Sequence, residues 1–381
     1  MTLPGPGALA GVRVVDLSRN APGPYASMLL ARLGAEVVTV AGGRTGEALP
    51  ELAMGKRQIT LDLRSGDGVR ALERLVAEAD VLLESFRPGV LDRLGVGYEH
   101  LAALNPRLVY CALTGYGQQG RLRAAAGHDI NYLAVTGVLG CLGPAGEPAV
   151  PPINLVADMG GGGLWAAFGV LAALHERSRT GRGRFVDASM VDGVLSMMGT
   201  WMTAWGTSIM PARGEGLMSG KAPFYRCYRC GDGEWVAVGA IEPRFFRELW
   251  RVVGLPGEPP DHLDPAGWPD LGARLEAVFA TRDRDEWADL ASDECCLTPV
   301  LAPDEVRRHP HHRDRLPQGA DVAPAELFPR VDWLSANPWV ADGDETEAIL
   351  RNAGLDEDTL ARVVSALASV PRPELAWPPA R

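Results

Sequence analysis

Runs of β-branched residues alternate with helix-forming stretches through the first half of the chain, and this alternation restricts the fold more than any other feature. Residues 12–17 and 36–40 are such runs, and residues 26–33 between them favour a helix. Strands that are joined through helices run parallel, and a parallel sheet needs helices on both faces. The pattern therefore predicts an α/β domain with a Rossmann-like parallel sheet. The expected strands are residues 12–17, 36–40, 59–63, 81–83, 108–113 and 185–188.

The turn after the first expected strand argues against a dinucleotide site of the usual Rossmann form. This turn, residues 18–24, contains Pro22 and Pro24 and no GxGxxG sequence. Because proline has no N–H group, the turn cannot present a row of amides to a pyrophosphate.

The second half of the chain changes character after two long apolar helices, expected at residues 160–176 and 190–206. Residues 224–230 and 234–240 flank a Gly-Asp-Gly turn and predict an antiparallel hairpin. Further helices are expected at residues 243–253, 270–280, 284–292 and 356–369, with a strand at 297–301. The expected division is a large α/β domain at residues 1–210 completed by 316–381, a smaller α+β domain at 225–310, and linkers at 211–224 and 311–330.

The chain is acidic, and its basic groups are almost all arginine. Its 381 residues carry 37 Lys and Arg against 48 Asp and Glu, which gives a net charge of −11. Only Lys56 and Lys221 are lysines. A broad basic surface for nucleic acid or for an anionic membrane is therefore not expected. We expect any anion to bind in a local pocket formed by guanidinium groups and backbone amides.

Signals for targeting, membrane insertion and metal binding are weak. Residues 1–10 lack the basic and apolar parts of a signal peptide, and the longest apolar run, residues 164–174, is too short to cross a bilayer. Cys227 and Cys230 form one CxxC pair without a second, so they lack the ligand set of a zinc site. The histidines within residues 309–312 are expected to lie on a solvated helix end. These observations predict a cytoplasmic protein that holds no metal.

Two segments carry the strongest chemical signal: Gly-His-Asp-Ile-Asn-Tyr at residues 127–132, and Asp158 followed by glycines at 160–163. Glycines allow a substrate to approach the backbone closely, and a helix N-terminus there could stabilise an oxyanion. Asp158 could equally cap the helix that follows, and a lone histidine such as His128 is more often structural. Glu242 precedes a proline after a strand, so it could enter a cleft or cap a helix. The residues alone leave these alternatives open.

These segments belong to a longer pattern that resembles the class III CoA-transferase superfamily and, within it, the α-methylacyl-CoA racemases. The similarity covers nearly the whole chain and is weakest after residue 315. Its most specific parts are GHDINYLAVTGVLG at 127–140 and PPINLVADMGGGG at the start of 151–193. The other matching segments are residues 11–40, 55–68, 80–120, 222–246 and 296–306.

The resemblance implies two possible chemistries for Asp158. Transferases of the superfamily use one aspartate as a nucleophile that forms an acyl anhydride and then an enzyme–CoA thioester, and Asp158 matches it. The racemases add a histidine, which matches His128, so the two residues resemble a two-base pair that inverts the α-carbon of a 2-methylacyl-CoA through an enolate. By resemblance Glu242 orients His128 or relays a proton, and backbone N–H groups from Asp158 to Gly161 are candidates to bind the enolate oxygen. A non-catalytic acyl-CoA binder is the third alternative.

The resemblance also implies an interlocked homodimer with no cofactor beyond the CoA moiety of its substrate. Its active site lies between the large domain of one chain and the small domain of its partner. The acidic residue and arginine that the family has after the second strand are replaced here by Ala41 and Gly42, and Arg44 could substitute for that arginine. The implied CoA-binding residues are Arg44, Leu61, Asp62, Leu63, Arg64, Ser85, Phe86, Arg87, Arg93, Gly127, Asp129, Ile130, Asn131 and Tyr132.

Overall fold

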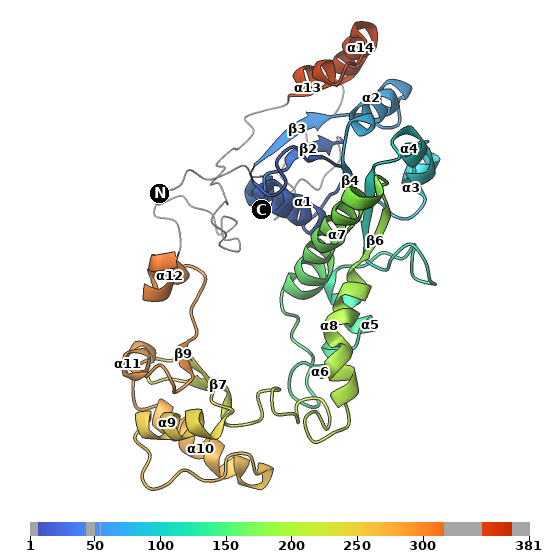
Figure 1. The fold of residues 1–381 in the computed structure, drawn as a ribbon. Coiled ribbons are helices and arrows are strands. Elements are labelled where there is room, and N and C mark those ends of the chain that lie inside the picture. Colours follow the sequence, from blue (N-terminus) through green and yellow to red (C-terminus); the bar gives the residue numbers. More distant parts are fainter. Residues whose placement is uncertain (1–6, 43–49, 54, 316–344, 368–381) are drawn as a thin grey trace. The chain divides into compact units, whose positions relative to one another are not determined.

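The computed structural model divides the chain into two units. The first unit combines Met1–Thr136, Pro152–Met197 and Asp321–Arg381, and the second combines Gly137–Pro151 and Met198–Ala320. A six-stranded sheet belongs to the first unit, and a three-stranded sheet belongs to the second. The residues that the structure describes are 7–42, 50–53, 55–315 and 345–367 (Figure 1).

The sheet of the first unit is fully parallel, which confirms the prediction from the alternating pattern. Its strand order is β3-β2-β1-β4-β5-β6. From β1 the chain first adds strands on one side of the sheet and then, from β4, on the other. The carboxyl ends of β1 and β4 therefore flank the switch point at which α/β folds bind ligands. The strands are β1 (Arg13–Asp16), β2 (Glu36–Ala41), β3 (Lys56–Thr60), β4 (Val81–Glu84), β5 (Val109–Thr114) and β6 (Phe185–Ser189).

Strand β3 begins and ends earlier than the sequence pattern predicts. We expected it at residues 59–63, but it occupies Lys56–Thr60. It is the edge strand of the sheet, where polar residues such as Arg57 and Gln58 are tolerated because they are only partly buried. Residues 61–63 consequently follow the strand, at the carboxyl edge of the sheet.

Helices cover both faces of this sheet (Figure 1). Helices α2, α4 and α14 pack on the face that includes Val15, Val38 and Leu82. Helices α1 and α7 contact each other on the opposite face. The helices of this unit include α1 (Pro22–Arg32), α2 (Gly66–Ala77), α3 (Val90–Arg93), α4 (Tyr98–Leu104), α5 (Asp129–Val135), α7 (Trp165–Thr180), α13 (Thr346–Asn352) and α14 (Glu357–Leu367).

A continuous helical segment runs from Leu155 to Thr180. Its first turns form a π-helix, η2 (Leu155–Leu164), and α7 continues it. This segment of 26 residues contains an 18-residue window with a mean hydropathy of 1.4, so by length and composition alone it could cross a membrane. The apolar run at residues 164–174 is therefore part of a longer helix than the sequence pattern indicated. A core helix passes the same test, and α7 packs against β5 and β6.

The C-terminal helices α13 and α14 return to the first unit. Ile349 and Leu360 are buried in the same core as the sheet. Arg57 of β3 pairs with Glu345 at 2.7 Å between Nη2 and Oε2. These contacts attach α13 and α14 to β3 and α2, and α14 confirms the helix expected near residues 356–369.

The second unit contains the expected antiparallel hairpin. Its main elements are β7 (Tyr225–Arg229), β8 (Trp235–Gly239), α9 (Pro243–Val252), α10 (Trp268–Phe279), α11 (Arg284–Leu290) and β9 (Leu297–Pro299). Strand β8 pairs with both β7 and β9. Phe224, Phe246 and Trp287 are fully buried between the sheet and the helices. The chain also forms α6 (Val138–Cys141), α8 (Met190–Ala204) and α12 (Pro310–Arg315).

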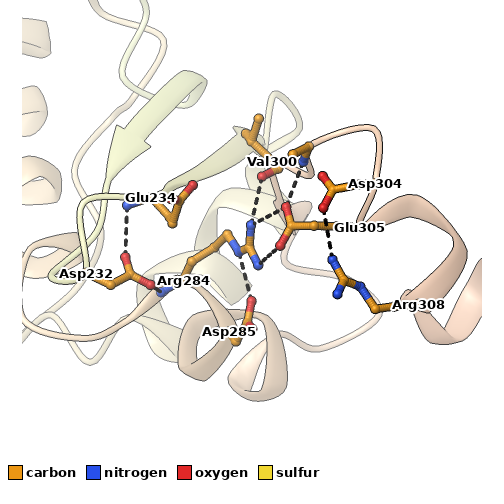
Figure 2. Close-up of polar contacts among 9 residues, drawn as sticks. Asp232, Glu234, Arg284, Asp285, Val300, Asp304, Glu305 and Arg308 are labelled. Atoms are coloured by element: carbon orange, nitrogen blue, oxygen red, sulfur yellow. Dashed lines mark hydrogen bonds and ion pairs between the residues drawn. The ribbon is translucent and has the colours of Figure 1, made fainter.

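A buried arginine connects separate segments of the second unit (Figure 2). The Arg284 guanidinium, in a residue that is only 7% exposed, contacts the two carboxylate oxygens of Glu305 at 2.7 and 2.9 Å. It also donates to the Val300 carbonyl at 3.3 Å, and the Arg284 backbone N–H donates to Asp232 at 3.0 Å. The hydrogen bonds to Glu305 raise the pKa of Arg284 and hold the pKa of Glu305 at about 2. This arginine therefore joins α11, the hairpin turn and the loop after β9.

We predict that Arg284→Met lowers the free energy of unfolding by about 2 kcal/mol, because charged hydrogen bonds at a buried site are lost. The charged Glu305 carboxylate contributes to the free energy of unfolding through its pairing with Arg284. This contribution is fully present above the ordinary pKa of 4.5 and is lost as the pH falls through about 2. Urea titrations between pH 2 and pH 6 should therefore show a weaker pH dependence for the variant. Arg308→Met, which breaks an exposed pair with Asp304, is the matched control and should resemble wild type. An unchanged stability for Arg284→Met would contradict this prediction.

Candidate active site

A buried polar cluster fixes the loop between β1 and α1 at the switch point. The Asp16 carboxylate is fully buried and accepts hydrogen bonds from the hydroxyls of Ser18 and Ser27. The Lys56 Nζ lies 3.7 Å from this carboxylate and donates to the Pro24 carbonyl at 2.7 Å. Burial lowers the pKa of Lys56 to about 8. The cluster ties the first residue of β3 and the first turn of α1 to the end of β1.

His128 is exposed at the start of α5, and its neighbours hold its backbone in place. The His128 N–H donates to Asn131 Oδ1 at 3.0 Å, and the Tyr132 hydroxyl donates to the Gly127 carbonyl at 2.6 Å. A Cβ at Gly115, the residue after β5, would collide with the Tyr132 ring. The hydrogen-bonded turn therefore packs against the carboxyl edge of the sheet and leaves the His128 side chain accessible.

The Asp129 carboxylate joins this turn to the π-helix η2. The side chain is buried, and its Oδ2 accepts hydrogen bonds from the N–H groups of Ala157 at 2.8 Å and Asp158 at 2.9 Å. Within the described residues, its second oxygen Oδ1 has no hydrogen-bond partner. Because Asp129 follows His128 and binds the amide of Asp158, it holds the segments that carry the two candidate bases together.

The Asp158 side chain is half-buried and has the properties of a proton-transfer group. Burial raises the pKa of its carboxyl group most strongly. A hydrogen bond from Asn154 Nδ2 at 3.4 Å and the charge of His128 lower this pKa, whereas the charge of Asp129 raises it further. The net shift is upward. A carboxyl group with a raised pKa can donate a proton as well as accept one.

One alternative for Asp158 and part of one expectation are wrong. Asp158 does not cap the following helix, because Asn154 occupies the N-cap position and Asp158 lies inside η2. Its backbone N–H is bonded to Asp129, and the N–H of Met159 donates to the Asn154 carbonyl at 3.3 Å. These two N–H groups are therefore already used, and the prediction of enolate binding is left to the N–H groups of Gly160 and Gly161.

The glycine run after Asp158 serves helix packing. A Cβ at Gly161 would collide with Val194 of α8, and a Cβ at Gly163 would come within 2.6 Å of the Pro22 carbonyl of α1. Both glycines are buried. At Gly161 and Gly163 the two neighbouring helices fill the space, so the expectation that the glycines admit the substrate is wrong for these two positions.

Glu242 belongs to the second unit and connects β8 to α9. It is the N-cap residue of α9, yet its side chain makes no capping hydrogen bond, so the capping alternative is not observed. The carbonyl of the preceding Ile241 accepts a hydrogen bond from His262 Nε2 at 2.8 Å. The His262 ring stacks on Phe246 of α9 with 4.2 Å between the ring centres. These contacts fix the backbone of Glu242 and leave its side chain exposed.

The expected CoA-binding residues after β3 differ in exposure. The Leu61 side chain is fully buried, so only its backbone can reach a ligand. Arg64 is exposed and pairs with Asp62 at 2.9 Å, and this hydrogen bond lowers the pKa of Asp62. Leu63 is partly buried against the core.

The expected residues after β4 lie beside the switch point. Ser85 Oγ accepts a hydrogen bond from the N–H of Arg19 at 2.8 Å. Arg87 and Arg93 are exposed.

In the GHDINY segment, Ile130 is exposed and Tyr132 is buried. Arg44 lies outside the described residues.

The sequence reasoning missed three residues of this site. Asn154 precedes Asp158 by one helical turn, so the spacing could have indicated their contact. Lys56 gave no local signal, because its partners are distant in sequence. Arg19 lies in a turn whose prolines dominate the sequence pattern.

The fold and the site together define an α/β protein with a histidine and a half-buried aspartate held at the carboxyl edge of a parallel sheet. Residues 9–316 match the model of CoA-transferase family III. The chain is 43% identical to alpha-methylacyl-CoA racemase of Mus musculus over 368 residues, and 40% identical to that of Homo sapiens over 370 residues. Each alignment covers 94% of this chain and 96% of the relative.

A crystal structure of a CaiB/BaiF family protein from Brucella suis has the same fold. It matches with a TM-score of 0.76 at 27% identity, over 92% of this chain and 100% of that chain. The chain belongs to CoA-transferase family III.

We predict that Asp129→Ala lowers kcat for an acyl-CoA substrate about 10–100-fold, because His128 and Asp158 are no longer held in register. Removing this negative charge also lowers the pKa of Asp158, so the acidic limb of the pH–rate profile moves to lower pH. Asp129→Asn keeps an acceptor oxygen and should recover part of kcat but not the position of the limb.

Asp80→Ala is the matched control for this experiment. Asp80 lies at the opposite edge of the sheet, where its Oδ2 accepts a hydrogen bond from the backbone N–H of Arg13 at 2.8 Å. Its removal should leave the pH profile unchanged. If Asp129→Ala lowered the midpoint of thermal unfolding but changed neither kcat nor the pH–rate profile, Asp129 would have a purely structural role.

Proposed function

We propose that this protein is a racemase that inverts the α-carbon of 2-methylacyl-CoA thioesters by 1,1-proton transfer through an enolate. The observation that supports it best is the set of hydrogen bonds by which Asp129 holds the backbone of Asp158 next to the turn that carries His128. The similarity to alpha-methylacyl-CoA racemases over 94% of the chain agrees with this reading.

Inversion at an α-carbon needs a base on one face of the substrate and an acid on the other. The α-proton of a thioester is weakly acidic, so a positioned base must remove it while the enolate oxygen is stabilised. A histidine and a carboxyl group with a raised pKa can each act as the acid or as the base. We assign one face to His128 and the other to Asp158, with Glu242 orienting His128 or relaying its proton.

A CoA-transferase mechanism is the alternative within the same family. In that mechanism Asp158 attacks the thioester as a nucleophile, and CoA passes to a second acid through an anhydride and an enzyme–CoA thioester. Burial raises the pKa of Asp158, which suits a group that both accepts and donates a proton. The accessible His128 beside it also has no step to perform in CoA transfer. Both features favour the racemase.

Incubation with either enantiomer of a 2-methylacyl-CoA in deuterated water tests the proposal. We expect the α-proton to exchange for deuterium and both enantiomers to reach the same racemic mixture, followed by NMR and chiral chromatography. His128→Ala and Asp158→Asn should each slow racemisation by about 10²-fold or more. CoA transfer to a free acid without exchange, together with trapping of Asp158 by hydroxylamine, would overturn the proposal.

We also propose that the chain works in the cytoplasm as an interlocked homodimer and needs no cofactor beyond the CoA moiety. Several large apolar side chains on described helices are exposed, and such surfaces often form protein interfaces. In the first unit they include Phe168 of α7 at 63% exposed and Leu164 of η2 at 54% exposed. A partner chain that covers this surface can bring its own Glu242 to the site.

Co-expression of His128→Ala chains with Glu242→Gln chains tests the shared site. A mixed dimer would contain one site with both native residues, so statistical pairing should restore about a quarter of the wild-type sites. The matched control combines His128→Ala with Asp158→Asn, two residues of the same unit, and should restore nothing. A monomer in sedimentation, or no recovery in the first mixture, would contradict the shared site.

A further inference from the structure

We propose that Arg19 binds the phosphates at the nucleotide end of CoA, from the space that a side chain at position 42 would otherwise fill. The inference rests on the proposed function, because it takes a CoA thioester as the ligand. It adds a residue of the turn after β1 to a site that we expected to be formed by the loops after β2, β3 and β4 and by residues 127–132.

Arg19 lies at the switch point of the sheet. Its backbone N–H donates to Ser85 Oγ at 2.8 Å, which joins the loop after β1 to the loop after β4. The carbon of its guanidinium group lies 5.5 Å from the centre of the Phe86 ring. Ser85 and Phe86 are both expected to contact CoA, so the guanidinium group lies among the residues of the same site.

Gly42 leaves room for this guanidinium group. A Cβ at position 42 would collide with Arg19 Nη2 and would lie 3.6 Å from Arg19 Cζ. The Leu61 carbonyl oxygen would be 3.9 Å from the same Cβ. Arg19 therefore occupies the place of a side chain at the end of β2, where the resemblance leads us to expect an arginine. We infer that one guanidinium group binds phosphate beside position 42, and that it is supplied by the loop after β1 and not by the residue after β2.

A phosphate at this edge requires a side-chain cation, because the neighbouring backbone cannot replace one. Helix α1 begins at Pro22 and has Pro24 as its third residue, so its first turn lacks two of the N–H groups that helix N-termini offer to phosphates. A guanidinium group can bind phosphate oxygens bidentately while it contacts an aromatic ring. Arg19 beside Phe86 has this arrangement.

Binding of 3′,5′-ADP, which corresponds to the nucleotide end of CoA, tests the proposal by calorimetry on the full chain. Arg19→Ala should weaken this binding about 10–100-fold, because charge-assisted hydrogen bonds are lost. Arg19→Lys should recover only part of it, since an ammonium group cannot bind bidentately. Arg13→Ala is the matched control: Arg13 lies at the other end of β1, pairs with Glu78 at 3.0 Å and should not affect binding. A folded Arg19→Ala protein with wild-type affinity would overturn the proposal.

Exchanging the two positions provides a sharper test. Gly42→Arg alone should weaken binding, because the added side chain displaces the Arg19 guanidinium group from this place. The double variant Arg19→Gly with Gly42→Arg should bind 3′,5′-ADP more tightly than either single variant. A double variant as weak as Arg19→Gly alone would show that the two positions do not serve the same phosphate.

Comparison of substrates separates this inference from the proposed function. Arg19→Ala should lower the ratio of kcat/KM for the acyl-CoA to that for the matching acyl-pantetheine, which lacks the nucleotide. A wild-type protein that binds 3′,5′-ADP through Arg19 but exchanges no α-proton would refute the racemase and support the role of Arg19. A wild-type racemase whose Arg19→Ala variant keeps both the affinity and the ratio would refute the role of Arg19 alone.

Discussion

The hydrogen bonds that the Asp129 carboxylate accepts from the amides of Ala157 and Asp158 determine the arrangement of the site. They join segments 28 and 29 residues apart and hold the start of α5 against a π-helix. The glycines of that π-helix let α1 and α8 pack closely, so its position is fixed from the other side as well. Main-chain geometry thus positions both candidate bases, which suits a reaction that needs two groups on opposite faces of one carbon.

The carboxyl edge of the sheet provides two different environments. Near β1 and β4, the buried Lys56–Asp16 cluster fixes the loop that carries Arg19, and this region offers guanidinium groups. Near β5, the half-buried Asp158 lies in a less polar environment that raises its pKa. An acidic chain can therefore bind a polyanionic group locally without a basic surface. In the proposed function, the nucleotide of CoA occupies the first environment and the thioester occupies the second.

The sequence predicted those parts of the fold that depend on local patterns. β-branched runs identified every strand of the parallel sheet, and only the polar edge strand β3 was displaced. The interpretation of Gly161 and Gly163 as substrate access was wrong, because close helix packing and substrate access call for the same residue type. The contacts of Asp129 with Asp158 and of Arg19 with Gly42 could not be predicted, since only the folded chain creates them.

The central claim is that His128 and Asp158 serve opposite faces of the α-carbon, and stereospecific exchange tests it most directly. Each enantiomer of a 2-methylacyl-CoA is incubated in deuterated water with His128→Ala and with Asp158→Asn, and α-deuterium incorporation is measured before any inversion occurs. We predict that each variant exchanges the proton of only one enantiomer, and that the two variants select opposite enantiomers. Equal loss of exchange for both enantiomers in both variants, or the same preference in both, would contradict the two-base account.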